Sequence, residues 1–229
     1  MFVMVPPRYD FLNRLLTWTL DERWRRLAAR ECLKQNPRRM LDLCCGTGDL
    51  ALRAASLGSD GTEFTGLDFS EPMLEVARRK RNARRLDGKV DFIHGDAGEL
   101  PFPDGYFDVV GISFAFRNIT YKNPLRERYL SEMARVTAPG GRCVIVETSQ
   151  PRSRLLRAMA HLYFRTVVPQ AGRLLGSNRG AYRYLSESAR RYYDAGEVAQ
   201  MLREAGFRDV SYRHLFGGVA ALHTGVRQT

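Results

Sequence analysis

The residues best placed to do chemistry surround a glycine turn early in the chain. Residues 40–50 read MLDLCCGTGDL: a short apolar run carries Asp42 and turns through Gly46 and Gly48 into a helical pattern. Glycine lacks a Cβ, so the backbone can adopt positive φ there and a ligand can lie against it. Such a turn also points the N–H groups of a helix N-terminus at the ligand. A strand, a glycine turn and a helix in this order predict a binding loop.

Two further carboxylates follow at the ends of later strands. Residues 63–67 form a strand pattern that ends in Asp68, and Asp96 stands in the loop after the strand pattern of residues 90–93. A carboxylate at the end of the second strand is suited to both hydroxyls of a ribose. Asp96 can accept from the exocyclic amine of an adenine, although a helix N-cap explains it nearly as well. A nucleoside-containing cofactor on a doubly wound sheet is therefore predicted.

The turn alone leaves two cofactors open. Gly46, Gly48 and Ala51 are spaced as in the dinucleotide fingerprint G-x-G-x-x-A, which indicates NAD. The other candidate is S-adenosylmethionine, whose turn typically reads D-x-G-x-G and cradles no pyrophosphate. A turn that merely packs a helix on a strand is disfavoured, because Asp68 stands where a ribose needs it.

A fourth strand pattern, residues 106–114, leads into Arg117 and Asn118. In a doubly wound sheet the end of this strand lies beside the cofactor, at the topological switch point. Both residues are thus predicted at the reacting end of the site. The alternative is an exposed basic loop.

Composition limits the class of protein. The 229 residues are 44% hydrophobic, which suffices for one domain with a sizeable core. No run of about 18 apolar residues exists, and the first residues do not resemble a signal peptide. The four cysteines show no metal spacing, so no metal site is predicted, and a reducing compartment is favoured. The net charge of +11 indicates nucleic acid or an anionic lipid surface as a partner, or reflects genomic bias.

The remaining elements predict the architecture. Residues 9–34 read as one or two helices that either cover the mouth of the sheet as a lid or simply pack on it, and periodicity favours packing. Residues 150–176 read as a core helix, a membrane-surface helix or a substrate cap. Residues 207–215 and 218–224 read as a final antiparallel strand pair. We expect an α/β fold: a Rossmann-like methyltransferase with a mostly parallel seven-stranded sheet, an antiparallel C-terminal strand and helices on both faces.

From Tyr9 to the C-terminus the chain resembles the UbiE/MenG methyltransferases of ubiquinone and menaquinone biosynthesis. The matching residues lie within the segments 9–13, 24–25, 41–49, 66–74, 95–102, 107–108, 113–118, 139–142, 182–185, 205–207 and 217–223. Ser-Phe-x-x-Arg-Asn at 113–118, Tyr-x-Tyr-Leu at 182–185 and Ala-Leu-His at 221–223 are the most specific of them. The chain departs from the family pattern at Ala115-Phe116 and at Thr148-Ser149-Gln150, near the expected substrate pocket.

The resemblance implies S-adenosylmethionine as the cofactor. By resemblance Thr47, Asp68, Asp96, Ala97 and Ser113 contact it, together with the turn residues Asp42, Gly46 and Gly48. Arg117 and Asn118 are expected at the quinol ring as catalytic residues, and Tyr9, Asn13, Arg117 and Tyr184 are expected to bind the substrate. The family reading implies one methyltransferase domain over 1–229, with a helical lid at 1–38, a cofactor-binding core at 39–149 and substrate-capping helices with the strand pair at 150–229.

The implied reaction is C-methylation of a polyprenyl quinol, foremost demethylmenaquinol to menaquinol. Arg117 is expected to stabilise the phenolate, and Asn118 to orient the hydroxyl or a water. The enzyme is expected in the cytoplasm, in contact with the anionic inner face of the membrane, and a homo-oligomer is left open. Three alternatives remain: a methyltransferase of another prenylated or phenolic molecule, a tRNA or rRNA methyltransferase, and a non-catalytic relative. The scattered arginines disfavour nucleic acid.

Overall fold

A computed structural model describes residues 14, 16–174 and 179–228. The strands are β1 (Arg39–Leu43), β2 (Glu63–Asp68), β3 (Val90–His94), β4 (Phe107–Ser113), β5 (Thr137–Thr148), β6 (Phe207–Leu215) and β7 (Ala220–Arg227). The helices are α2 (Leu20–Cys32), α3 (Asp49–Leu57), α4 (Glu71–Ala83), α5 (Phe116–Thr120), α6 (Arg126–Val136), α7 (Arg154–Leu174), α8 (Arg179–Arg191) and α9 (Ala195–Glu204), with the 3₁₀ turn η1 (Phe216–Gly218).

The strands form a single sheet in the order β3-β2-β1-β4-β5-β7-β6. All neighbouring pairs are parallel except those of β7, which runs antiparallel to both β5 and β6. The order reverses between β1 and β4, so the carboxyl ends of these two strands form the crevice in which ligands bind in such sheets. The predicted fold is confirmed.

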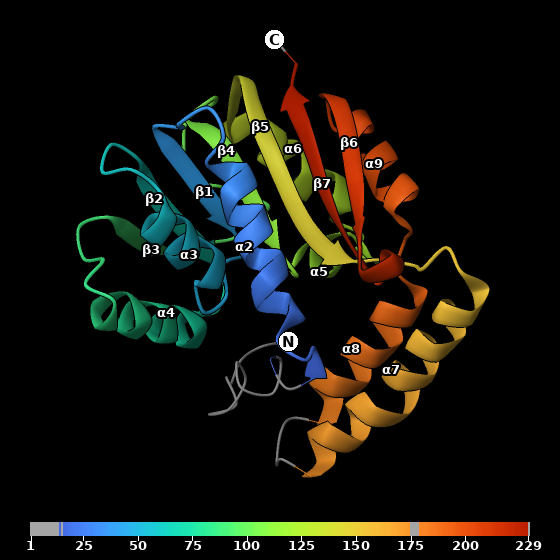
Figure 1. Cartoon of the computed structure of the whole chain (residues 1–229). Coiled ribbons are helices and arrows are strands. Elements are labelled where there is room, and N and C mark those ends of the chain that lie inside the picture. The colour runs from blue at the N-terminus through green and yellow to red at the C-terminus, as the bar shows by residue number, and fades with distance from the viewer. Residues whose placement is uncertain (1–13, 15, 175–178, 229) are drawn as a thin grey trace.

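Helices cover both faces of the sheet (Figure 1). One core lies between the sheet and α2 and α3, where Trp24, Ala28, Leu50 and Val144 are buried together. The other lies under α5, α6 and α9, where Phe116, Met133 and Leu202 are buried. In the described part of the N-terminal segment, α2 is a packing helix on the sheet. A lid over residues 1–38 stays a prediction, because residues 1–13 and 15 lie outside the described residues.

Helices α7 and α8 form an antiparallel hairpin that extends beyond the carboxyl ends of the parallel strands (Figure 1). They pack on each other through Tyr163, Phe164 and Val168 of α7 and Leu185 of α8. The Tyr163 hydroxyl donates to the carbonyl oxygen of Leu16, at 2.6 Å, so the start of the described chain is tied to the hairpin. Helix α8 was not predicted, although its sequence has a pronounced amphipathic period.

Candidate active site

The glycine turn connects β1 to α3 as predicted, and its two glycines differ in their surroundings. Gly46 (φ 55°) and Gly48 (φ 77°) both adopt the left-handed conformation that glycine permits without a Cβ clash. A Cβ on Gly48 would lie 2.5 Å from the Phe92 ring, whereas a Cβ on Gly46 would meet nothing within 4 Å. Gly48 is therefore required for packing, while Gly46 lies at the open side of the turn, where a ligand can approach the backbone.

Asp68 ties the turn to the end of β2. One carboxylate oxygen accepts from the backbone N–H of Gly46, at 2.7 Å, and the other from that of Ser70, at 2.8 Å. Burial raises the pKa of Asp68, while these N–H groups and His94 act against the rise. A carboxylate oxygen has two lone pairs, so each oxygen keeps capacity for a ribose hydroxyl. The predicted position beside the turn is confirmed, and the contact with a ribose stays a prediction.

Three carboxylates gather around the turn. Burial raises the pKa of the Cys44 thiol, and the charges of Asp68, Asp42 and Asp96 raise it further, so all three carboxylates lie near this thiol. A cluster of negative charge at the carboxyl ends of the strands attracts a cation and repels an anion. The charges of these residues therefore fit the sulfonium cation of S-adenosylmethionine and disfavour the pyrophosphate of NAD.

Asp42 and Thr47 are both buried in the base of the turn. The Asp42 carboxylate accepts from the N–H of Ala51 at 2.9 Å, and burial, with Asp68 adding to it, raises the pKa of Asp42 to about 7. Lys80 donates to the Thr47 hydroxyl at 2.9 Å and to Asp49 at 2.8 Å. Helix α4 thus turns Lys80, one of the cations in its basic C-terminal part, inward to the binding loop. Direct contacts of Asp42 and Thr47 with the cofactor stay predictions.

The loop after β3 holds Asp96 and Ala97. Asp96 is exposed, and its carboxylate accepts from the N–H of Gly98 at 2.8 Å. No helix begins here, so the N-cap alternative is wrong and the hydrogen bond closes a turn instead. Ala97 is buried in the core below the loop.

Phe69, directly after Asp68, is exposed, and its ring centroid lies 5.8 Å from that of His94. It is a candidate contact for a ligand that the sequence did not single out.

Ser113 ends β4 at the switch point and accepts from Arg25 of α2, with 3.2 Å between Arg25 Nε and the hydroxyl oxygen. The guanidinium also lies 5.2 Å from the Phe114 ring centroid and pairs with buried Asp21 at 2.5 Å. Arg25 is thus a candidate site residue that sequence reasoning missed. The only signal was its place in a segment resembling the family, because 88 residues separate Arg25 from Ser113.

Arg117 lies in the short helix α5 and not in an exposed loop, so the alternative weighed for it is wrong. It is 4% exposed and pairs with Glu147 of β5, which is completely buried. Glu147 accepts from the Arg117 backbone N–H at 3.0 Å and from Nη1 at 3.1 Å, and Nη1 also donates to Thr148 at 2.5 Å. The guanidinium is therefore a positioned donor whose charge Glu147 compensates. Its Nε is buried without a hydrogen-bond partner among the described residues.

Asn118 and Tyr184 come together, as predicted for site residues, in a pocket of about 470 Å³. The other lining residues are Tyr121, Lys122, Asn123, Pro124, Glu187 and Ser188. Burial raises the pKa of Tyr184, and Arg117 and Glu147 lie near enough to act on it in opposite directions. Asn118 directly follows Arg117 in α5, so the pocket lies beside the helix that carries the buried Arg117. Tyr9 and Asn13 lie outside the described residues.

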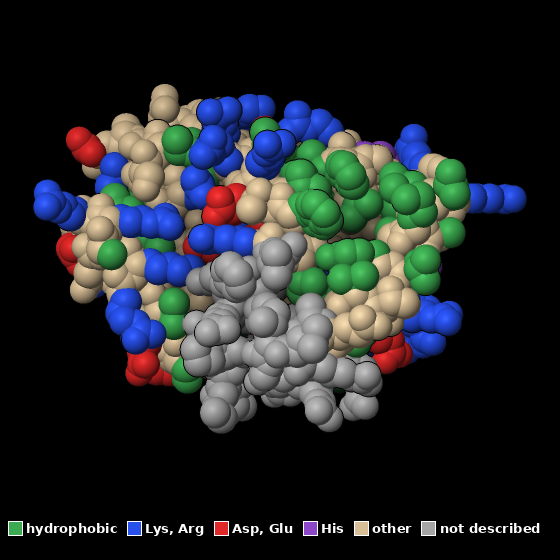
Figure 2. Space-filling view, turned by 60° about the horizontal axis from the view of Figure 1, so that its bottom comes forward, with side chains coloured by type: hydrophobic (Ala, Val, Ile, Leu, Met, Phe, Trp, Pro, Cys, Tyr) green, Lys and Arg blue, Asp and Glu red, His purple; other side chains and the backbone are tan. Residues whose placement is uncertain are grey.

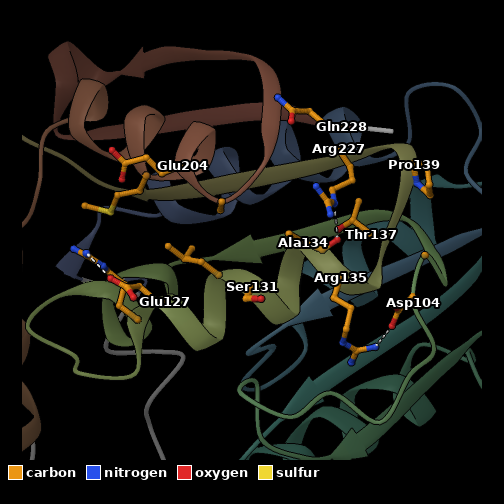
Figure 3. A pocket seen from close by; sticks show the side chains of 15 residues that line it. Asp104, Glu127, Ser131, Ala134, Arg135, Thr137, Pro139, Glu204, Arg227 and Gln228 are labelled. Carbon is orange, nitrogen blue, oxygen red and sulfur yellow. Dashed lines mark hydrogen bonds and ion pairs between the residues drawn. The ribbon is translucent and has the colours of Figure 1, made fainter.

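A larger pocket, of about 770 Å³, lies at the opposite end of the sheet between α6, α9 and the start of β5 (Figure 3). Its basic side chains are engaged by the protein: Arg135 pairs with Asp104 at 2.8 Å and with Glu132 at 2.6 Å. Arg227 donates to the carbonyl oxygens of Ala134 and Gly206. Ligands bind at the carboxyl ends of such sheets, so this pocket is not the candidate active site.

Within the described ranges, no three His, Cys, Asp or Glu side chains are grouped closely enough to hold a metal ion. Among the helices that the structure describes, none has the length and apolar character that crossing a bilayer requires.

Comparison with known proteins identifies the family of the chain. The model of the ubiE/COQ5 methyltransferase family matches residues 1–227. A demethylmenaquinone methyltransferase of Thermus thermophilus is 46% identical over 99% of this chain and 100% of its own length. A demethylmenaquinone methyltransferase of Geobacillus kaustophilus is 43% identical over 100% of this chain and 95% of its own. A ubiquinone/menaquinone biosynthesis C-methyltransferase UbiE of Geobacter sulfurreducens is 40% identical over 98% of this chain and 86% of its own length.

Solved structures share the fold at low identity. A SAM dependent methyltransferase from Aquifex aeolicus superposes with a TM-score of 0.60 at 17% identity, covering 90% of this chain and 97% of its own. The [4+2]-cyclase SpnF superposes with a TM-score of 0.68 at 20% identity, covering 93% of this chain and 82% of its own. A shared fold does not fix the chemistry, so the family match carries the assignment. The chain belongs to the ubiE/COQ5 methyltransferase family, which decides between the two cofactors in favour of S-adenosylmethionine.

Proposed function

We propose that this protein methylates a ring carbon of a polyprenyl quinol, converting demethylmenaquinol to menaquinol. One observation carries the proposal: relatives named demethylmenaquinone methyltransferase match the chain along its whole length, at 46% identity in the Thermus thermophilus protein. The match includes the segments that hold Arg117, Asn118 and Tyr184. The geometry of these three residues supports a site for a phenolic ring.

The acceptor is proposed to lie in the pocket lined by Asn118 and Tyr184, with a hydroxyl facing Arg117. The buried Arg117 Nε–H has no partner in the described chain, and a buried donor without an acceptor is costly. A quinol oxygen would satisfy it. Glu147 holds the guanidinium in place, so little reorganisation is needed when the oxygen gains negative charge.

S-adenosylmethionine supplies, when bound, an electrophilic methyl group. The quinol hydroxyl gives up its proton, which makes the adjacent ring carbon strongly nucleophilic, and a donor at the oxygen lowers its pKa below the ~10 of a free phenol. The ring carbon forms the new C–C bond as the C–S bond breaks and its electron pair remains on sulfur. The ring C–H proton then leaves and the phenolate oxygen takes up a proton, which restores the aromatic quinol. Arg117 stabilises the oxygen, and Asn118 orients the hydroxyl or the water that takes its proton.

For the cofactor, we propose that Asp68 accepts from the ribose, that Asp96 and Ala97 hold the adenine, and that the backbone of Gly46, Thr47 and Gly48 lies along the methionine part. Ser113, held by Arg25, would then face the transferred methyl group.

We place the enzyme in the cytoplasm, in peripheral contact with the anionic inner face of the membrane, where a prenylated acceptor dissolves.

Methyl transfer from labelled S-adenosylmethionine tests the proposal. The acceptor is demethylmenaquinol, either reduced or oxidised, and the product mass is measured. We expect label in the reduced acceptor only, because a quinone ring has no hydroxyl to deprotonate. Cofactor binding without transfer to any quinol would overturn the proposal, and label in RNA would replace it with the RNA methyltransferase reading.

A further inference from the structure

Helix α7 exposes an apolar stripe to solvent. Leu155, Met159 and Leu162 are 73%, 60% and 59% exposed, and their spacing of four and three residues puts them on one side of the helix. The opposite side is filled, since Phe164 and Val168 pack toward Leu185 of α8. In a view turned toward this end of the molecule, hydrophobic side chains gather over the α7–α8 side (Figure 2). Contiguous apolar surface of this kind marks an interaction site.

A fourth apolar side chain extends the stripe to the sheet. Phe216, in η1 between β6 and β7, is 63% exposed. The adjoining Gly217 packs directly on Leu156 in the first turn of α7. Phe216 therefore lies beside the beginning of the stripe, and the apolar surface runs from η1 along α7.

The charges along α7 are of one sign. Between Glu147 and Glu187 the sequence contains no Asp or Glu and seven arginines, at positions 152, 154, 157, 165, 173, 179 and 183. Arg154 and Arg165 are both exposed, and their separation of 11 residues aligns them along α7. An apolar stripe beside cations is the pattern of a helix that lies in a bilayer interface.

We propose that Leu155, Met159, Leu162 and Phe216, flanked by Arg154 and Arg165, form a membrane-docking face that binds an anionic lipid bilayer. The inference rests on the proposed function for its purpose, because a prenylated quinol must be taken from lipid. The face belongs to the same hairpin that supplies Tyr184 to the acceptor pocket. A second copy of the chain is a poorer occupant, since a two-fold interface would bring two carboxylate-free, arginine-rich segments together.

Co-sedimentation with vesicles tests the docking face. The protein is mixed with vesicles of phosphatidylglycerol or of phosphatidylcholine. We expect the wild type to bind the anionic vesicles more tightly. The variant L155Q/M159Q/L162Q should lose roughly a hundredfold in partitioning, because three apolar side chains no longer enter the interface. The variant R154Q/R165Q should lose about fivefold per arginine on anionic vesicles only.

Matched controls lie elsewhere on the surface. L57Q removes another exposed apolar side chain, and R79Q/R84Q removes two exposed arginines, Arg79 in α4 and Arg84 directly after it. Both should bind vesicles like the wild type. Equal loss in these controls, or unchanged binding of the stripe variant, would overturn the proposal. A wild-type dimer in sedimentation velocity that the stripe variant converts to a monomer would also overturn it and assign the face to a second copy.

A soluble acceptor separates this inference from the proposed function. On a short-chain demethylmenaquinol without lipid, the stripe variant should keep the wild-type turnover, which also shows that it is folded. On long-chain quinol in vesicles its turnover should fall with its binding. If the wild type methylates no quinol but docks through these residues, the proposed function fails while the docking face stands.

Discussion

Replacing Glu147 by Gln should destabilise the protein strongly. The carboxylate has no exposed surface and accepts from Arg117 at 3.0 and 3.1 Å and from Thr148 at 2.8 and 2.7 Å. The amide of Gln is of similar size but leaves the buried Arg117 cation uncompensated. Breaking a buried ion pair from one side costs about 3–5 kcal/mol of unfolding free energy. For a domain of this size we expect the melting temperature to fall by roughly 6–20 °C.

The double variant R117M/E147L separates charge from packing. A buried pair replaced by apolar residues of similar volume is often neutral or stabilising, so the unfolding free energy of the double variant should fall no more than about 1 kcal/mol below that of the wild type. Its methyl transfer should nevertheless fall roughly tenfold to a hundredfold, because a charge-assisted hydrogen bond to the acceptor is lost. Binding of S-adenosylmethionine should change little.

Urea unfolding followed by circular dichroism measures the stabilities, and calorimetric titration measures cofactor binding. E147D, which keeps the charge, is expected between E147Q and the wild type. The reasoning is refuted if E147Q loses less than about 1 kcal/mol, since a broken buried pair costs several times that. It is also refuted if R117M/E147L is as unstable as E147Q, which would mean that shape and not charge makes Glu147 necessary.

Three further predictions concern the cofactor turn and pH. Gly48→Ala should lower the unfolding free energy by more than ~1 kcal/mol, because it adds a Cβ against Phe92 at a positive φ, whereas Gly46→Ala should fold but bind S-adenosylmethionine more weakly. If both variants lose the same unfolding free energy and the same affinity for S-adenosylmethionine, the two glycines do not have these different roles. Asp68→Asn should weaken cofactor binding roughly tenfold to a hundredfold, measured by calorimetry, and unchanged affinity would remove Asp68 from the ribose site. Burial lowers the pKa of His223 to about 4, below the ~6.5 of the unfolded chain, so the unfolded state binds the proton first and stability is lost as pH falls from about 6.5 to 4. In the variant His223→Gln, the loss of unfolding free energy between these pH values should be smaller by roughly 3 kcal/mol, as measured by unfolding at each pH. If the unfolding free energy of the variant depends on pH as in the wild type, His223 is not a buried neutral imidazole.

The fold was predictable because its signals are local. Apolar runs and the turn through Gly46 and Gly48 gave β2 and the start of α3 as the structure has them. The position of Asp68 followed from the same local pattern. Helix α5 carries only five residues and was read as the end of a strand, since a segment so short shows no period.

The site was less predictable because its contacts are distant in sequence. Lys80 looked like one of many surface cations, yet it bonds Thr47, 33 residues away. Glu147 was not singled out from the sequence, although it holds Arg117 from 30 residues further on. No periodicity reports which charged side chain turns inward, since that depends on the partner that the fold brings to it. Arg117, predicted as the cation that stabilises the phenolate, is in the structure a buried donor whose charge Glu147 compensates.

Locating the transferred methyl group tests the central claim most directly. The protein is supplied with S-adenosylmethionine labelled with ¹³C at the methyl group and with reduced demethylmenaquinol, and the product is examined by NMR. We expect the signal of a methyl group on a ring carbon, with both quinol hydroxyls retained. A methoxy signal would contradict this claim, because the oxygen that Arg117 is proposed to hold would then be the nucleophile and not the activating group.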